Sequence, residues 1–500
     1  MYIGVDCGTQ STKVVVLDGE RLEILGEAAR PHSMIQGDHG RREQDPDEWV
    51  SAFEAALAEA LERAGVDGGA IRAIGVSGQQ HGMVALDAEG RPVHPGKLWC
   101  DTESVRENDA LIEALGGERG CLERLGLVLQ TGYTASKVAW LRKHHYDAYA
   151  RIETLLLPHD YLNYYLTGER VAEYGDASGT GYFDTRERCW SLDTFALIAP
   201  ELDPDRVLPR LVEPDAPAGR LRPEIARRLG LGPQVVVSSG GGDNMMGAIG
   251  TGNIVPGTMT ISLGTSGTLY AASEHPAISS GGLVANFCSS HGGWLPLICT
   301  MNVTSATTLV RELLGYDIER FNAAAVDAPV GAGGITVLPF FNGERVPPLP
   351  EAMATFEGLG SHNFTPANLC RAVMEGATFG LRYGFDELSR LTGHPSRVRL
   401  VGGGAKSAVW RQMVSDVMDV ELACPEIGEA AALGAALQAI WCERRQAGES
   451  LILESLCERA VGLREETLTR PDAGRVAGYA EAYARYLEIL GQRYPATRAE

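Results

Sequence analysis

Two aspartates in the sequence stand beside glycine-containing turns that follow apolar runs. Asp6 follows the apolar residues 2–5, and Asp243 follows the turn Ser239-Gly-Gly-Gly after residues 234–238. A carboxylate at the end of a buried strand is costly unless it is paired or lies near a metal ion. In phosphoryl transfer, such a carboxylate can accept the proton of the attacking hydroxyl. Asp243 is therefore our candidate general base, and Asp6 our candidate for holding Mg²⁺, directly or through water.

Both aspartates also have structural interpretations. Asp6 can cap its own turn, and Asp243 can act as the N-cap of a following helix. Taken alone, Asp6 leaves the choice open, and Asp243 alone would favour the helix cap.

Two hairpins favour the functional interpretation. Residues 6–12 and 263–268 each form a Gly-Thr turn between strand-like segments, and they lie about half the chain apart. Turns rich in Gly, Thr and Ser expose N–H groups and hydroxyls to an anion. A Walker-type sequence is absent, so this would be a different phosphate clamp. The candidate ATP-binding residues are Gly8, Thr9, Gln10, Thr12 and Lys13 in the first hairpin, and Gly264, Thr265 and Ser266 in the second.

Polar and aromatic residues on two loops are candidates for binding a hydroxylated substrate. Gln80 and His81 follow the strand-like residues 73–77, and Trp99 and Asp101 lie on the next loop. With Asn244 and Asp243 they form the predicted substrate set. A loop histidine is more often structural or exposed, and Trp99 and Asp101 are weak signals taken alone.

A further glycine loop follows the strand-like residues 398–401. Its candidate contacts to adenosine are Gly403, Gly404, Ala405 and Ser407. The alternative is an ordinary flexible turn between strand and helix. The spacing does not match a dinucleotide fingerprint.

Strand-like and helix-like segments alternate along the chain, which predicts an α/β fold. A helix is expected over 45–65, with Asp45 as N-cap, Glu48 completing a capping box and Gly65 ending it. The repeated hairpin predicts two related domains that face each other across a central cleft. We place them at residues 1–244, carrying the sugar site and first hairpin, and 245–500, carrying the ATP site. A closing helix is expected over 474–494.

Composition limits the partners. The formal net charge of −21 over 500 residues argues against nucleic acid and anionic membrane as partners. The chain opens on the first strand without a signal segment, and no apolar run reaches the length of a membrane span. We therefore expect a cytoplasmic protein.

Several motifs in order resemble those of the FGGY carbohydrate kinases, within the actin, hexokinase and Hsp70 ATPase superfamily. One family signature is resembled by the segment Tyr133-Thr-Ala-Ser-Lys137-Val-Ala-Trp140 of this chain. A second family signature is resembled by the segment Gly402-Gly-Gly-Ala-Lys-Ser407-Ala-Val-Trp410. Gly343-Glu-Arg-Val-Pro347 resembles a third motif, with Val in place of Thr. The resemblance covers nearly the whole chain, and it implies two actin-like (ribonuclease H-like) ATPase domains that use ATP and Mg²⁺.

The resemblance also implies roles for residues of this sequence. It gives Asp243 as proton acceptor, Gln80 and His81 as sugar contacts, Asp6 near the metal, Gly264 and Thr265 at the phosphates, and Gly403 and Gly404 near adenosine. The segments 78–82, 157–162 and 242–244 favour D-xylulose, phosphorylated at its 5-hydroxyl. Two departures lie near the presumed pocket: Gln80, where Met is common, and Glu103, where Arg is frequent.

The alternatives within the family are kinases of another pentulose, a polyol, gluconate or glycerol. From other classes, a nucleotide-switched binding protein on the same scaffold would need a peptide-binding domain, and a regulator would need a basic helix-turn-helix. The resemblance also favours a homodimer.

Overall fold

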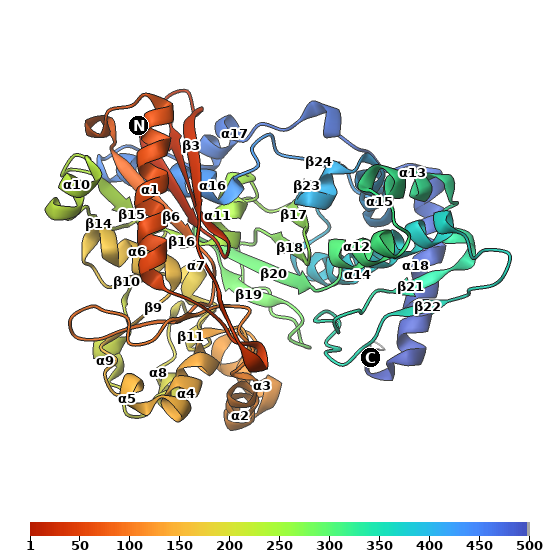
Figure 1. Cartoon of the computed structure of the whole chain (residues 1–500), viewed down its shortest axis with the longest axis horizontal. Helices are drawn as coiled ribbons and strands as arrows, with labels where there is room; N and C mark the ends of the chain where they lie inside the picture. The colour runs from red at the N-terminus through yellow and green to blue at the C-terminus, as the bar shows by residue number, and fades with distance from the viewer. Residues whose placement is uncertain (498–500) are drawn as a thin grey trace. The chain divides into compact units, whose positions relative to one another are not determined.

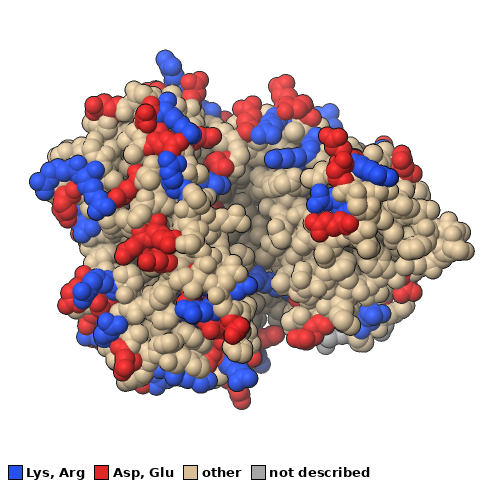
Figure 2. Space-filling view, viewed as in Figure 1, with Lys and Arg blue, Asp and Glu red and all other residues tan. Residues whose placement is uncertain are grey.

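The computed structural model describes residues 1–497, which form two compact units. The first comprises Met1–Ile254, Ser273–Leu295 and Glu429–Val461, and the second comprises Val255–Ala272, Pro296–Gly428 and the chain from Gly462 onward. Acidic and basic side chains are interspersed on the faces seen in Figure 2. Among the described residues, no helix combines the length and the apolar character needed to cross a bilayer.

The first unit is built on a sheet of order β14-β15-β6-β1-β2-β3, with β16 paired to β6 (Figure 1). Its strands are β1 (Tyr2–Cys7), β2 (Ser11–Leu17), β3 (Ile24–Pro31), β6 (Ala73–Gly78), β14 (Pro217–Arg220), β15 (Val236–Ser238) and β16 (Gly241–Gly242). β1 runs antiparallel to β2 and parallel to β6. The predicted opening hairpin and the strand after it are therefore confirmed.

Helices cover both faces of this sheet. α1 (Pro46–Ala64) packs on β2 and β3, and α16 (Ala430–Gln446) packs on β1 and β6. A Cβ atom at Gly4 would lie 1.9 Å from the carbonyl oxygen of Ala432, so only glycine allows α16 to approach β1 this closely.

The local signals for α1 are mostly confirmed. Asp45 accepts a hydrogen bond from the Asp47 N–H, and Gly65 ends the helix in the left-handed conformation. The expected capping box is wrong, because the Glu48 carboxylate accepts hydrogen bonds from Ser33 instead. A tertiary partner has replaced the local one.

The other elements of the first unit surround this core. Its helices are α2 (Val105–Leu115), α3 (Gly117–Leu125), α4 (Thr134–His144), α5 (Tyr146–Tyr149), α6 (Pro158–Thr167), α7 (Tyr174–Ala177), α8 (Leu192–Ile198), α9 (Pro204–Val207), α10 (Pro223–Leu229), α11 (Asp243–Gly250) and α17 (Leu453–Ala460). Its short strands are β4 (Ile35–Gln36), β5 (Arg42–Gln44), β7 (Val84–Leu86), β8 (Gly96–Lys97), β9 (Thr154–Leu156), β10 (Val171–Glu173), β11 (Phe183–Asp184), β12 (Cys189–Trp190), β13 (Arg210–Val212) and β19 (Ala285–Cys288).

The second unit repeats the central pattern of the first. β17 (Thr258–Leu263) runs antiparallel to β18 (Gly267–Ala271) and parallel to β23 (Arg397–Val401), just as β1 does to β2 and β6. Its sheet continues through β20 (Trp294–Thr300) and β24 (Leu422–Ala423). The predicted α/β fold with two related hairpins is confirmed.

Helices pack around this second sheet, and α14 lies against α12, α13 and β18. The helices are α12 (Thr304–Leu313), α13 (Ile318–Asp327), α14 (Pro366–Thr392), α15 (Ala408–Met418) and α18 (Ala473–Arg493), and a small sheet joins β21 (Thr336–Leu338) to β22 (Thr355–Glu357). α18 is the expected closing helix.

Candidate active site

The first unit brings the ends of three neighbouring strands to one edge of its sheet. Asp6 of β1 is paired with Ser77 of β6, which is paired with Gly241 of β16. The Ser77 hydroxyl donates to Asp6 Oδ1 at 2.9 Å. α11 begins at Asp243, directly after β16, so both candidate aspartates lie at this edge. Asp243 is not the N-cap of α11, which is Gly242.

Both aspartates ionise less readily than in water. Burial raises the pKa of Asp6 to about 6 despite the hydrogen bond from Ser77. Burial, and then the negative charge of Asp6, raise the pKa of Asp243 to about 7. A carboxylate with a pKa near neutrality is suited to accept and release a proton at physiological pH.

A hydrogen-bonded chain connects Asp243 to the predicted sugar loop. The N–H and the side-chain amide of Asn244 donate to Asp243 Oδ1 at 2.8 and 3.0 Å. The same amide donates to Gln80 Oε1 at 2.7 Å. Gln80 is buried, and its Nε2 has no hydrogen-bond partner among residues 1–497. Because a buried donor of this kind is costly, the atom is suited to a ligand oxygen.

His81 is held in an unusual backbone conformation, with φ of 65°. Its ring lies 4.7 Å from that of Tyr133 and 5.6 Å from that of Phe287. A Cβ atom at Gly179 would lie 2.0 Å from His81 Nδ1, so the ring rests on a glycine. The imidazole is thus fixed beside Gln80 by packing on several sides.

The turn between β1 and β2 has an interior support that sequence analysis missed. The buried Gln44 side chain donates to the Thr9 carbonyl at 2.7 Å and accepts from Gln79 at 3.0 Å. Gln79 Oε1 in turn accepts from the Thr9 hydroxyl at 3.2 Å. No local motif marks Gln44, because its partners lie far away in the sequence.

The remaining predicted residues of this hairpin are spread around the turn. The Gly8 N–H closes the turn onto the carbonyl of Ser11 at 3.1 Å, and Gln10 is exposed. Thr12 is buried and bonds His32 at 3.3 Å. Lys13 Nζ lies 2.5 Å from Glu429.

The structure places Trp99 and Asp101 differently from each other. Trp99 is partly exposed, and its indole N–H donates to the Thr9 hydroxyl at 3.0 Å, which puts it against the first hairpin. Asp101 is fully buried, and its oxygens accept from Lys97 at 3.0 Å and from the N–H groups of Arg42 and Glu103. Its acceptor capacity is used within the protein.

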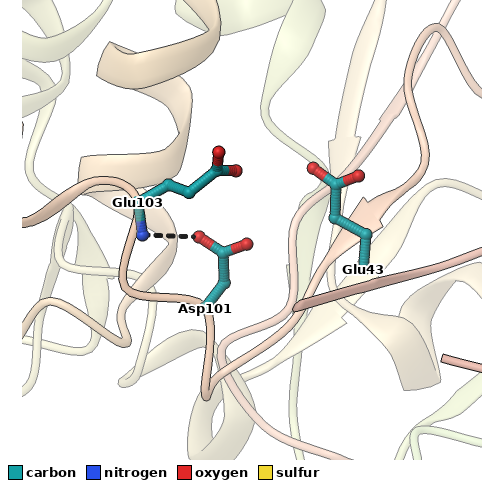
Figure 3. A group of neighbouring side chains, drawn as sticks. All are labelled: Glu43, Asp101 and Glu103. Atoms are coloured by element: carbon teal, nitrogen blue, oxygen red, sulfur yellow. Dashed lines mark hydrogen bonds between the residues drawn. The ribbon is translucent and has the colours of Figure 1, made fainter. Parts of the chain in front are cut away.

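Glu43, Asp101 and Glu103 point their carboxylates toward one another (Figure 3). Three carboxylates in this arrangement could hold a metal ion, but the ammonium of Lys97 already contacts each of them, at 2.9, 3.0 and 2.6 Å respectively. We therefore interpret the group as a buried ion-pair network. Glu103, one of the two departures from the family pattern, is a member of it.

The second unit brings its own two predicted loops together. Carbonyls of Gly264 and Thr265 accept from the N–H groups of Thr304 and Val303 at 3.0 and 3.3 Å, which fixes the turn after β17. A Cβ atom at Gly404 would lie 2.8 Å from the Leu263 side chain, so the second glycine loop packs on the end of β17.

Within these loops the predicted residues differ in what holds them. Around Gly403 no atom of the described protein would meet an added Cβ, so the packing of the chain does not explain this glycine. Ser266 is partly exposed and Ala405 is buried. Ser407 is the N-cap of α15, and its hydroxyl donates to Asn322 at 3.0 Å.

Comparison with known proteins identifies the family. Residues 1–250 match the N-terminal domain of the FGGY family of carbohydrate kinases, and residues 259–442 match its C-terminal domain. The chain is 52% identical to a xylulose kinase of Haemophilus influenzae, over 99% of this chain and 100% of the relative. It is 38% identical to a xylulose kinase of Streptomyces coelicolor, over 88% of this chain and 87% of the relative.

A solved structure agrees with these matches. The xylulose kinase of Bifidobacterium adolescentis superposes with a TM-score of 0.83 at 32% identity, over 96% of this chain and 99% of that one. The resemblance found in the sequence is therefore confirmed. The chain belongs to the FGGY family of carbohydrate kinases, enzymes that transfer a phosphoryl group from ATP to a carbohydrate hydroxyl.

Proposed function

We propose that this enzyme phosphorylates D-xylulose at its 5-hydroxyl, with Asp243 as general base. The observation that carries the proposal is the chain Asp243–Asn244–Gln80 at the strand ends of the first unit. The 52% identity to a xylulose kinase over nearly the full chain supports the choice of sugar.

The base is prepared by its hydrogen bonds. Asn244 donates twice to Asp243 Oδ1, which orients the carboxyl group and leaves Oδ2 to accept the hydroxyl proton. A pKa of about 7 allows Asp243 to take this proton as the oxygen attacks the γ-phosphorus, and to release it to solvent afterwards.

Gln80 and His81 would position the sugar. The unpartnered Nε2 of Gln80 can donate to a sugar oxygen, and the packed His81 ring offers a fixed polar edge. Contacts of Trp99 and Asp101 with the sugar stay predictions. Because the Asp101 oxygens already have partners, we expect this residue to act through the shape of its loop.

Mg²⁺ fits the carboxylates at this edge. Asp6 and Asp243 are only partly buried, and the charge of Asp6 raises the pKa of Asp243, so a nearby divalent cation would stabilise both ionised forms. We propose Asp6 as the residue that holds the ion, directly or through water. When bound, Mg²⁺ supplies neutralisation of phosphate charge.

We propose nucleotide contacts in each unit separately. In the first unit, backbone N–H groups and hydroxyls of Gly8, Thr9, Gln10 and Thr12, with Lys13, are proposed to bind phosphate. In the second unit, Gly264, Thr265 and Ser266 are proposed to bind phosphate, and Gly403, Gly404, Ala405 and Ser407 to lie near adenosine. We accordingly assign the sugar to residues 1–244 and most of ATP to residues 245–500. A homodimer and a cytoplasmic location stay predictions.

The test is ADP release with MgATP against D-xylulose, D- and L-ribulose, L-xylulose, xylitol, gluconate and glycerol. We expect kcat/KM to be highest for D-xylulose, and ³¹P NMR of the product to show a 5-phosphate. Preference for another member of the panel would contradict the assignment of D-xylulose as the substrate, but it would still agree with a carbohydrate kinase activity. No stimulation by any of them would contradict the proposed function.

A further inference from the structure

A buried lysine lies behind the predicted sugar loop. Lys137, on α4, has no exposed surface. Its ammonium donates to three backbone carbonyls, those of Gly132, Tyr133 at 3.1 Å and His81 at 3.0 Å. An ammonium has three N–H donors, so this set satisfies it completely.

Such a burial is hard to explain by packing alone. Removing an ammonium group from water disfavours its charged form, and burial lowers the pKa of Lys137 to about 7, although Asp101 opposes this. A methionine or leucine would fill the same volume without that cost. We therefore attribute the burial of Lys137 to its hydrogen bonds with the three carbonyls. Only one of these carbonyls lies outside the segment of the chain that carries Lys137.

That distant partner is the carbonyl of His81. The Thr134 hydroxyl, from the first turn of α4, donates to the same carbonyl at 3.2 Å. Two side chains of one helix thus fix the backbone of His81, whose φ of 65° is uncommon for any residue other than glycine. A peptide group held in this way also fixes the direction of the Gln80 and His81 side chains beside it.

We infer that Lys137 is a positioning residue for sugar binding, which acts with Thr134 to hold the Gln80–His81 segment in the conformation that meets the sugar. This inference rests on the proposed function, since it assumes that Gln80 and His81 contact the sugar. It predicts that losing the ammonium weakens sugar binding while ATP binding is kept.

The test compares Lys137→Met and Thr134→Val with wild type and with Lys143→Met. Lys143 lies on the same helix, but it is exposed and pairs with Glu107 at 2.8 Å, so its loss is the matched control. Sugar affinity is measured by calorimetry with D-xylulose alone, KM for both substrates by ADP release, and folding by circular dichroism.

We expect Lys137→Met to raise the Kd and KM for D-xylulose by about tenfold or more, because a buried carbonyl loses its strongest donor. Thr134→Val should raise both by about threefold, because Lys137 still holds the carbonyl. KM for ATP should stay within about twofold, and Lys143→Met should match wild type.

Unchanged sugar affinity in folded Lys137→Met would overturn the inference, as would equal losses for sugar and ATP. If Lys137→Met does not fold, Thr134→Val decides: unchanged sugar affinity overturns the inference, and a selective loss supports it. Failure of the proposed function is seen earlier, in wild type. If wild type binds no sugar of the panel, both proposals fall, whereas sugar binding that the variants leave unchanged removes only this one.

Discussion

At the scale of single residues, the burial proposed to make Asp243 a general base also has a cost in stability. Its carboxyl group is partly buried beside the charge of Asp6, which raises its pKa to about 7. Asp243→Asn keeps the shape and removes both the proton acceptor and the charge. We expect kcat to fall by about 10²- to 10⁴-fold, the usual contribution of a general base, while circular dichroism shows an unchanged fold.

The control for this variant is Asp109→Asn, which removes an exposed carboxylate from α2. It should retain wild-type turnover. Near-wild-type kcat in Asp243→Asn would remove Asp243 from the role of base, and a fall in Asp109→Asn would point to a general effect of charge.

The same pKa predicts two opposite responses to pH. If Asp243 is the base, it must be ionised, so log(kcat/KM) for the sugar should rise with unit slope at low pH and level off at or below about pH 7, because bound Mg²⁺ would favour the ionised form. The stability of the ligand-free protein should change the other way. An unfolded Asp ionises near pH 3.8, so the contribution of this group is fully present below that pH and is lost as pH rises through about 7.

Urea unfolding at a series of pH values checks this second response. Asp243→Asn should be more stable than wild type by up to about 4 kcal/mol at pH 8 and should nearly match it at pH 4. A constant difference across this range would mean that the folded-state pKa of Asp243 is close to its ordinary value.

At the scale of elements, the turn between β1 and β2 depends on Gln44. This buried side chain bonds the Thr9 carbonyl, Gln79 and the Trp49 indole N–H. Gln44→Leu leaves those groups without partners, so we expect stability to fall by about 2 kcal/mol or more. If the turn binds phosphate, KM for ATP should rise by about tenfold, and more than KM for the sugar.

Gln36→Leu, at an exposed position of β4, is the matched control and should change stability by less than about 0.5 kcal/mol. A Gln44→Leu enzyme that is destabilised but keeps its KM for ATP would show that the turn has a structural role only.

Sequence signals and structure agree best where the signal is local. The hairpins at Gly8 and Gly264 and the Asp45 cap were predictable, because turn and cap residues act on their immediate neighbours. Gln44 and Lys97 were not, because each satisfies groups brought together by distant segments. Lys137 belongs to a segment that resembles a family motif, but its hydrogen bond to the His81 carbonyl is a tertiary contact that the motif does not predict.

At the scale of the whole molecule, local sequence patterns do not predict which unit a later segment of the chain joins. Glu429–Val461 returns to the first unit, where α16 packs against β1 and β6, although it follows the strands of the second unit in sequence. The closeness of α16 depends on glycines such as Gly4, whose need becomes clear only when the partner is known.

The proposed assignment of the sugar to the first unit and of most of ATP to the second gives the last prediction. If the sugar binds at Asp243 and Gln80, then D-xylulose alone should slow amide hydrogen exchange around α11 and the end of β6. If ATP binds mainly to the second unit, then MgADP alone should slow exchange in the β17–β18 turn and in the Gly402–Ser407 loop. Bound ligand protects the amides it contacts and raises the free energy of local opening, by about 2.7 kcal/mol at a concentration one hundred times its Kd. Exchange followed by mass spectrometry, with each ligand added separately, distinguishes the two patterns. Protection of the second unit by the sugar, or of α11 alone by the nucleotide, would reverse the assignment, and the proposed roles of Gln80 and Gly403 would fall with it.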